Sequence, residues 1–545
     1  MSFDVLKLAR PEIVALEPYI SDRLEGDLES GIIALDVNEN SYAGTGNNRY
    51  PLAKPQNLYN RLADIYGVDQ SKLLVTRGSD DAIDCIIRAF CSAGEDAILT
   101  MPPTFGMYKI SAKIQGAACF EVPLTTELEV DFNAIDKSLA QNANIKIVFL
   151  CSPQNPVGSS LSYAKMLKTI KANPQRLFVA DEAYIEFSSQ KSLLDELDTL
   201  PNLIILRTLS KAYGLAGLRI GIAISSPDIL GLVAKILPPF LLPTPSVNLA
   251  LTALSPAGLA KCKIEVEEII SERKSLTKNL MKLPCVKSIA DSDANFILVK
   301  FADASASQLI LQKAGIKVKP FTGLIENCLR ITVGSPAENK LVLAALGADI
   351  NLAEPRIGYV ERTSKETSIF ARVNLDSDKP TDISTGIEFF DHMLEQVSKH
   401  SGIGFTLKAS GDIGVDAHHT VEDCMIVLGQ AFRDALGDKR GVKRYGFSLP
   451  MDEARADVLI DLSGRGHTVF NCTFKATMLG QLPTEMIAHA VASFAESLKA
   501  AIHVDVVGTN DHHKAEAVFK GLAKALKEAC KIEGNTLPTT KGMLA

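Results

Sequence analysis

The stretch Leu177-Phe-Val-Ala-Asp-Glu-Ala-Tyr184 is an apolar run that ends in acidic and aromatic residues. Similar short apolar runs occur at 97–100, 145–150 and 203–206, and helical patterns separate them. Strands that are apolar almost throughout and alternate with helices are typical of a mostly parallel sheet covered on both faces. The sequence therefore predicts an α/β large domain at about residues 35–245.

Two further changes of pattern divide the chain. A long charged helix near residues 263–281 and two later strands predict a small α+β lobe, built from about residues 246–348 and the N-terminal segment. The pattern ends near residues 350–356 and then restarts with alternating strands. We therefore predict two domains, 1–352 and 353–545, as expected of a chain longer than one hydrophobic core usually serves.

The composition excludes several classes of protein. The net charge of −7 argues against a nucleic-acid partner, which normally requires a basic face. The ten cysteines are scattered without a CxxC pair, as in a reduced cytoplasmic protein. No membrane span is expected, because the most apolar stretch, residues 229–243, is interrupted by Lys235 and two prolines.

All nine histidines lie in the last third of the chain, from His392 onward. Four of them form two doublets with a glutamate at the same spacing, His-His-Thr-Val-Glu at 418–422 and His-His-Lys-Ala-Glu at 512–516. Adjacent histidines on a helix diverge by about 100°, so one doublet suits two different ions better than one. The doublets therefore predict two metal centres with nitrogen and oxygen ligands, a set that suits Mn, Fe or Zn.

The doublets also mark an internal repeat. Their offset is 512 minus 418, or 94 residues, and the helices that follow them keep similar apolar positions. Each doublet has one further histidine on an upstream helix, His392 or His489. We predict an α+β domain of two similar halves, about 357–440 and 441–545, each a sheet with helices. Three other histidines lack this spacing and are expected to be structural: His400, His467 and His503.

Six motifs in this block resemble imidazoleglycerol-phosphate dehydratase over nearly all of residues 357–545. They are Phe389-Phe-Asp-His-Met-Leu, His418-His-Thr-Val-Glu-Asp, Leu462-Ser-Gly-Arg, Pro483-Thr-Glu-Met, Asp511-His-His-Lys-Ala-Glu-Ala and Thr540-Lys-Gly-Met. The resemblance implies removal of water from imidazoleglycerol phosphate to give imidazole-acetol phosphate, with two Mn²⁺ ions at each site. Two Lewis acids on the substrate's imidazole would stabilise the charge that develops as the C–H and C–OH bonds break.

The same resemblance implies roles for individual residues. One ion would be held by His418, His489, His512 and Glu516, and the other by His392, His419, Glu422 and His513. Glu366 is the expected proton-transfer group, and Glu516 is a second catalytic candidate. The substrate and its phosphate would be bound by Gln396, Arg444, Arg465, Lys520, Thr540 and Lys541. Gly466 departs from the family's usual proline, and we expect only a local backbone change there.

The first two thirds of the chain contain no histidine and carry a different set of motifs. In chain order these are Gly78-Ser-Asp-Asp81, Asn155-Pro-Val-Gly158, Asp181-Glu-Ala-Tyr184 and Thr208-Leu-Ser-Lys211, with Arg219 eight positions later. The first motif opens a helix whose N-terminus can bind phosphate. In this order the motifs resemble a fold-type I pyridoxal-phosphate (PLP) aminotransferase over about residues 5–348.

This second resemblance implies a cofactor site. Lys211 would attach PLP and move the proton, Asp181 would pair with the ring nitrogen, and Phe105 would stack on the ring. Asn155 and Tyr184 would hydrogen-bond the ring hydroxyl. The cofactor phosphate would be surrounded by Ser79, Asp80, Thr208, Ser210 and Arg219, and by Tyr50 of a second subunit, which implies a homodimer.

The substrate of the first domain is less defined by the sequence. Tyr19, Asn38 and Arg330 resemble substrate-binding residues of the histidinol-phosphate aminotransferase branch, but Lys319 replaces a second arginine usual there. An aromatic amino acid or a phosphorylated amine therefore stays an alternative. The fusion favours imidazole-acetol phosphate with glutamate as the amino donor, so that the two domains would perform consecutive steps of histidine synthesis. In a third hypothesis the second domain is mainly an assembly module, because that family builds closed shells of about 24 subunits.

Overall fold

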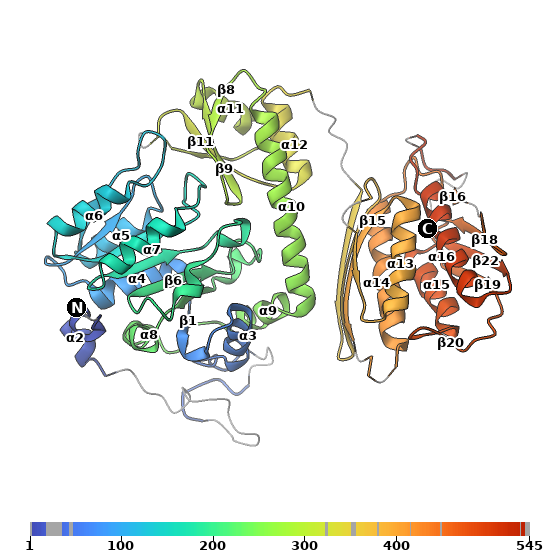
Figure 1. Cartoon of the computed structure of the whole chain (residues 1–545), viewed down its shortest axis with the longest axis horizontal. Helices are drawn as coiled ribbons and strands as arrows, with labels where there is room; N and C mark the ends of the chain where they lie inside the picture. Colours follow the sequence, from blue (N-terminus) through green and yellow to red (C-terminus); the bar gives the residue numbers. More distant parts are fainter. Residues whose placement is uncertain are drawn as a thin grey trace. The chain divides into compact units, whose positions relative to one another are not determined.

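The computed structural model describes residues 3–17, 35–42, 47–321, 325–349, 356–378, 381–411, 413–414, 416–446, 449–534 and 536–539. The chain forms two compact units (Figure 1), one of residues 1–254 and 262–352 and one of residues 255–261 and 353–545. In the described part of the chain, no helix combines the length and the apolar character needed to cross a membrane.

A seven-stranded sheet forms the core of the first unit, in the order β1-β7-β6-β5-β4-β2-β3. Its strands are β1 (Leu73–Thr76), β2 (Ala97–Thr100), β3 (Ala118–Glu121), β4 (Ile145–Cys151), β5 (Leu177–Asp181), β6 (Leu203–Thr208) and β7 (Gly221–Ile224). Strands β3, β2, β4, β5 and β6 run parallel, whereas β7 is antiparallel to both of its neighbours. The apolar runs correctly predicted this mostly parallel sheet, because its central strands are buried on both faces.

Helices cover this sheet. They are α1 (Val5–Leu8), α2 (Pro11–Ala15), α3 (Gln56–Tyr66), α4 (Ser79–Phe90), α5 (Met107–Gln115), α6 (Phe132–Gln141), α7 (Tyr163–Ala172), α8 (Pro227–Ala234) and α9 (Thr244–Ala253). Helix α4 begins where β7 passes the chain very closely, since a side chain on Gly221 would lie 2.3 Å from the Ser79 amide nitrogen. The glycine thus lets the helix N-terminus reach the carboxyl edge of the sheet. Helix α1 packs on the same core as α4.

The small lobe of the first unit has an antiparallel sheet in the order β10-β11-β9-β8. Its elements are α10 (Pro256–Leu280), β8 (Val286–Ile289), β9 (Phe296–Phe301), α11 (Ala304–Lys313), β10 (Lys319–Pro320), β11 (Cys328–Thr332) and α12 (Pro336–Ala345). Leu276 and Leu280 of α10 pack in one apolar cluster with Val299, Leu329 and Leu343. The lobe is α+β, as predicted.

The second unit is an α+β structure with two sheets. The first has the order β12-β13-β15-β14, and the second has the order β16-β18-β22-β19 with β17 beside β18. In each sheet one pair is parallel, β14 with β15 and β19 with β22, and the others are antiparallel. The four long helices lie between the sheets (Figure 1), and α14 packs on α15 and α13 on α16 in a single apolar core.

The histidine motifs stand at the beginnings of helices in the second unit. The first half contains β12 (Ile357–Thr363), β13 (Thr367–Asn374), β14 (Asp382–Ser384), α13 (Glu388–Ser401), β15 (Gly404–Gly411) and α14 (His418–Leu436). The second contains β16 (Tyr445–Gly446), β17 (Leu449–Met451), β18 (Ala454–Asp461), β19 (His467–Asn471), β20 (Met478–Leu479), β21 (Leu482–Pro483), α15 (Glu485–Leu498), β22 (Ala501–Val507) and α16 (Asp511–Ala529). Each histidine doublet therefore lies in the first turn of a long helix.

Candidate functional sites

A cavity of about 220 Å³ lies at the carboxyl ends of β4, β5 and β6 in the first unit. Ligands of open α/β sheets bind at this edge. Ten of the eleven residues predicted to bind the cofactor line the cavity: Ser79, Asp80, Phe105, Asn155, Asp181, Tyr184, Thr208, Ser210, Lys211 and Arg219. Cys151, Ala183 and Ala216 complete the lining and were not anticipated.

The inner end of the cavity is formed by a buried carboxylate. Asp181 Oδ2 accepts a hydrogen bond from the Tyr108 hydroxyl at 2.6 Å, and Oδ1 accepts one from the Ala183 amide at 3.2 Å. Burial raises the pKa of Asp181, and the two hydrogen bonds oppose that rise. Among the described residues Asp181 forms no ion pair, so a cationic group in the cavity would complete its environment.

Residues from both lobes meet at the side of the cavity. The Asn155 amide donates to the Tyr184 hydroxyl at 3.3 Å, and the Arg330 guanidinium of β11 donates to the Asn155 side-chain oxygen. The guanidinium also lies over the rings of Phe296 and Phe321, at 5.1 and 5.7 Å from their centroids. These contacts hold a fixed positive charge beside the cavity, where it can bind an acidic group.

Another set of lining residues is suited to an anion. Ser79 and Asp80 begin helix α4, and Arg219 lies 3.2 Å from the Asp80 carboxylate. The positive end of a helix and a guanidinium together favour a phosphate. Burial lowers the pKa of Lys211, and the nearby charge of Arg330 lowers it further. A larger share of this amine is therefore neutral and nucleophilic.

Three predicted residues of this unit are not placed in the cavity. Tyr50 is half-exposed and stacks on Phe240 with 4.7 Å between ring centroids, and Asn38 is exposed. Neither of them lines the cavity. Tyr19 lies outside the described residues.

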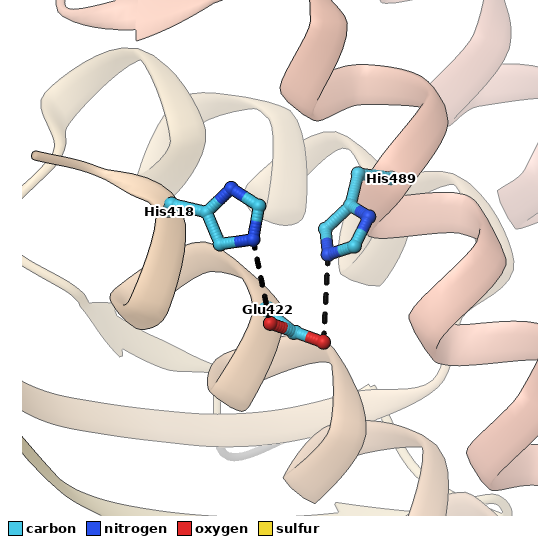
Figure 2. A group of neighbouring side chains, drawn as sticks. All are labelled: His418, Glu422 and His489. Carbon is cyan, nitrogen blue, oxygen red and sulfur yellow. Dashed lines mark ion pairs between the residues drawn. The ribbon is translucent and has the colours of Figure 1, made fainter.

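In the second unit, one candidate metal centre joins two helices (Figure 2). His418 and Glu422 come from α14 and His489 comes from α15. The two Glu422 oxygens lie 3.5 Å from His418 Nε2 and 3.5 Å from His489 Nε2. All three donor atoms fall within 4.8 Å of one another. Among the described residues His489 Nε2 is buried without a hydrogen-bond partner, as expected of a nitrogen that holds an ion.

A second cluster has a matching composition. His392 of α13 and His512 of α16 lie 3.5 and 3.3 Å from Glu516 Oε1. Lys520 lies 2.8 Å from Glu516 Oε2. Burial raises the pKa of Glu516, but Lys520, His392 and His512 together outweigh it, and the net change is downward. His392 also lies 3.4 Å from Gln396, so this predicted substrate-binding residue is near the cluster.

Within one chain, the structure thus groups the ligands differently from the resemblance. Glu422 lies with His418 and His489, and Glu516 lies with His392 and His512. The crossing of α14 on α15 and of α13 on α16 produces this grouping.

The second histidine of each doublet faces a different carboxylate. His419 Nδ1 lies 4.0 Å from Glu366, which is in the turn between β12 and β13. His513 Nδ1 lies 2.8 Å from Glu453, which is in the turn between β17 and β18. This pairing raises the pKa of His513 and lowers that of Glu453. The two histidines of each doublet face different carboxylates, as expected of adjacent positions on a helix, and their ring planes lie 85° and 78° apart.

Glu453 was not identified from the sequence, because no motif surrounds it. Its role is indicated only by the structure, where it lies in a turn between two strands and faces a doublet histidine, as Glu366 does. The Glu366 turn is fixed to α14 by Asp423, a buried residue beside Glu422. Asp423 accepts a hydrogen bond from Thr367 at 2.6 Å and pairs with Arg362.

The predicted phosphate-binding residues have mixed surroundings. Arg444 makes two hydrogen bonds to Asp461, at 2.6 and 3.0 Å, and a third to the Pro538 carbonyl at 2.9 Å. Arg465 is exposed, and Thr540 and Lys541 lie outside the described residues. The structure explains the glycine at position 466, because a Cβ atom there would lie 2.6 Å from the Glu496 Cα of α15. A small residue thus lets the segment before β19 pass close to the helix.

The first unit matches known proteins in sequence and fold. Residues 28–346 match the family model of class I and II aminotransferases, so the chain belongs to this family. It is 40% identical to histidinol-phosphate aminotransferase 1 of Pasteurella multocida, over 63% of this chain and 98% of that protein. It is 42% identical to the histidinol-phosphate aminotransferase of Stenotrophomonas maltophilia, over 63% of this chain and 97% of that protein. Within the class, this part of the chain is thus a histidinol-phosphate aminotransferase relative.

Solved structures of histidinol-phosphate aminotransferases are similar to the first unit in fold. Histidinol-phosphate aminotransferase of Sinorhizobium meliloti, in complex with pyridoxal-5'-phosphate, has a TM-score of 0.51 and 26% identity, and the match covers 55% of this chain and 82% of that one. The histidinol-phosphate aminotransferase of Clostridium acetobutylicum shares the fold with a TM-score of 0.51 and 21% identity, and the match covers 55% of this chain and 90% of that one.

Residues 385–526 match the family model of imidazoleglycerol-phosphate dehydratase. The chain is therefore a fusion of the two families.

Proposed function

We propose that this chain is a bifunctional enzyme of histidine biosynthesis. The second unit would dehydrate imidazoleglycerol phosphate to imidazole-acetol phosphate, and the first would transfer an amino group from glutamate to that product, giving histidinol phosphate. The observation that carries this proposal is the fusion itself, because the product of one family is the amino acceptor of the other. Another amino-acid substrate for the first unit is not favoured by these relatives.

The cavity of the first unit fits PLP. The bound cofactor supplies an electron sink next to the reacting carbon. Asp181 would pair with a protonated ring nitrogen, and its buried carboxylate, which has no ion pair among the described residues, supports this role. The α4 N-terminus and Arg219 would hold the phosphate, and Arg330 would hold the acidic end of the substrate. The Lys211 amine would attach the cofactor and move the proton between the two reacting carbons.

The His418–Glu422–His489 cluster fits a metal ion with nitrogen and oxygen ligands, and the His392–His512–Glu516 cluster offers the same donor types around one carboxylate oxygen. We propose Mn²⁺, as the family implies, because the donors are imidazoles and carboxylates without thiolates. Each cluster offers three donors from one chain, whereas His419 and His513 point away from them toward Glu366 and Glu453. Ligands from a second copy would then complete each site. This supports a homo-oligomer, with aminotransferase dimers and a dehydratase shell as the proposed assemblies.

The domain boundaries and the internal repeat are part of the same proposal. We place the aminotransferase at 1–352 and the dehydratase at 353–545. The same strand order and the same single parallel pair in both sheets support a repeat with halves at about 357–440 and 441–545. Ten cysteines without a disulfide among those described support a reducing, cytoplasmic location.

One preparation of purified chain tests the proposal. Metal analysis should find manganese, the absorbance spectrum should show the cofactor band, and both half-reactions should be measurable. Aromatic amino acids should be poor donors compared with glutamate and histidinol phosphate. Absence of the cofactor band would refute the reading of the first unit, and dehydration that is unchanged after metal removal would refute that of the second.

A further inference from the structure

We propose that Tyr108 is a positioning residue of the transamination site, which acts on the bound cofactor through Asp181 and Phe105 without touching it. The proposal rests on the proposed PLP site. Tyr108 is one helical turn beyond Phe105, at the start of α5, and its side chain is fully buried. It is not among the residues that line the cavity, although two of its neighbours are.

The hydroxyl of Tyr108 faces the Asp181 carboxylate and the Cys151 thiol. It donates to Asp181 Oδ2 at 2.6 Å, while the Ala183 amide donates to Oδ1 at 3.2 Å. Each oxygen of the carboxylate therefore has a donor that sets its direction. A hydrogen bond to an ionised acceptor is stronger than one between neutral groups, so the hydroxyl favours the charged carboxylate.

The ring of Tyr108 is held just as firmly. It stacks on Phe149 of β4 with centroids 4.5 Å apart and planes 13° apart. It meets the ring of Phe105 edge to face, with centroids 5.6 Å apart and planes 81° apart. One side chain thus supports both the carboxylate expected to pair with the ring nitrogen and the aromatic ring expected to stack on the cofactor.

The charges around Asp181 make this hydrogen bond important. The other ionisable groups that face it are Asp80 of α4, Glu182 in the same segment, Cys151 of β4, Tyr184 and Lys211. Burial and the two carboxylates raise the pKa of Asp181, and the Tyr108 hydroxyl lowers it. Asp181 and the ring nitrogen of the bound cofactor would share one proton. Without the Tyr108 hydroxyl, this proton would reside more on Asp181 and less on the ring nitrogen.

The direct test is Tyr108→Phe in the full chain, since phenylalanine keeps the stacking and removes only the hydroxyl. We expect the variant to retain the cofactor, to shift the pH profile of the cofactor absorbance, and to lower kcat for transamination roughly 10-fold or more, with a smaller change in KM. Dehydration should be unchanged. The matched control is Tyr59→Phe, a buried tyrosine of the same unit that accepts a hydrogen bond from the Val75 amide at 3.1 Å.

A double variant separates action through Asp181 from a general packing effect. If Tyr108 acts through this carboxylate, Tyr108→Phe should change the absorbance profile little in an Asp181→Asn background. A pH profile identical to that of the parent, or an equal shift in Tyr59→Phe, would overturn the proposal. So would a full additional effect in the Asp181→Asn background. A parent chain without any cofactor band would instead refute the proposed function.

Discussion

Glu422 bridges two helices through His489, because one of its oxygens lies 3.5 Å from that imidazole while the other lies 3.5 Å from His418 on its own helix. These residues are far apart in sequence and come together where α14 packs on α15. A carboxylate between two imidazoles, one of which has a buried nitrogen without a hydrogen-bond partner in the described part of the chain, is a strong arrangement for a divalent cation.

Replacement of Glu422 by glutamine should weaken manganese binding at least about 10-fold and reduce dehydration accordingly, because a ligand loses its charge. Equilibrium dialysis with metal analysis measures this loss. Glu496→Gln is the control, since Glu496 is an exposed residue of the same helix as His489 and pairs with Lys499. Equal metal affinity in the two variants would contradict the assignment.

Lys211→Ala should separate the two activities. Because the amine is the only proposed covalent attachment for the cofactor, transamination should fall by at least about a thousandfold. Dehydration should persist, because the metal clusters lie in the other compact unit. The two half-reactions are assayed separately on the same preparation. A parallel loss of dehydration would show that the variant disturbs more than the cofactor site.

Arg207 should be important for the stability of the first unit. It is a buried residue of β6 and pairs with Glu182 at 3.1 Å and Glu186 at 2.9 Å. Arg207→Met would remove the ion-pair partner of the buried Glu182 and the partly buried Glu186, and should lower the free energy of unfolding by about 3 kcal/mol. Urea denaturation with hydrogen exchange in β5 and β6 measures the effect. The control Lys72→Met, at the surface ion pair with Asp198, should cost less than about 1 kcal/mol.

Asp376 should give the second unit a defined pH dependence. Partial burial raises its pKa, but hydrogen bonds from Arg356 lower it more, so the folded pKa is below the ordinary value of 3.8. A depressed carboxyl pKa stabilises the folded state above the unfolded pKa, and the contribution is lost as the pH falls through the folded value.

Asp376→Asn should therefore be less stable than the parent at pH 7, by up to about 1 kcal/mol because the pair is partly exposed. The difference should shrink as the pH falls below 4. Hydrogen exchange of the second unit at several pH values measures it, with exposed Glu395→Gln as control. A difference that grows on acidification would have the wrong sign.

The parts of the fold that depend on local pattern were predictable from the sequence. The central strands are apolar on both faces, so their runs revealed the parallel sheet. Adjacent positions on a helix diverge by about 100°, so the two histidines of each doublet were expected to face different groups, and they do. The cofactor motifs stand at the ends of predicted strands, which explains why ten of their residues converge on one cavity.

The remainder depends on how helices and turns pack. Which histidines share a carboxylate is decided by the α14–α15 and α13–α16 crossings, which no local pattern specifies. Glu453 resembles a surface residue until its turn is placed beside His513. Tyr108 resembles an ordinary core aromatic in the sequence, since its partner Asp181 lies 73 residues away at the end of β5. The sequence suggests that Arg444 is free to bind phosphate, but its guanidinium donates hydrogen bonds to Asp461 and to the Pro538 carbonyl.

One chain should perform the two consecutive reactions. The purified, metal- and PLP-loaded chain is incubated with imidazoleglycerol phosphate and glutamate, and all three phosphorylated imidazole compounds are followed by mass spectrometry. We expect histidinol phosphate and 2-oxoglutarate to form in equal amounts, after a transient rise of imidazole-acetol phosphate. Accumulation of imidazole-acetol phosphate without histidinol phosphate would contradict the account, as would no consumption of imidazoleglycerol phosphate.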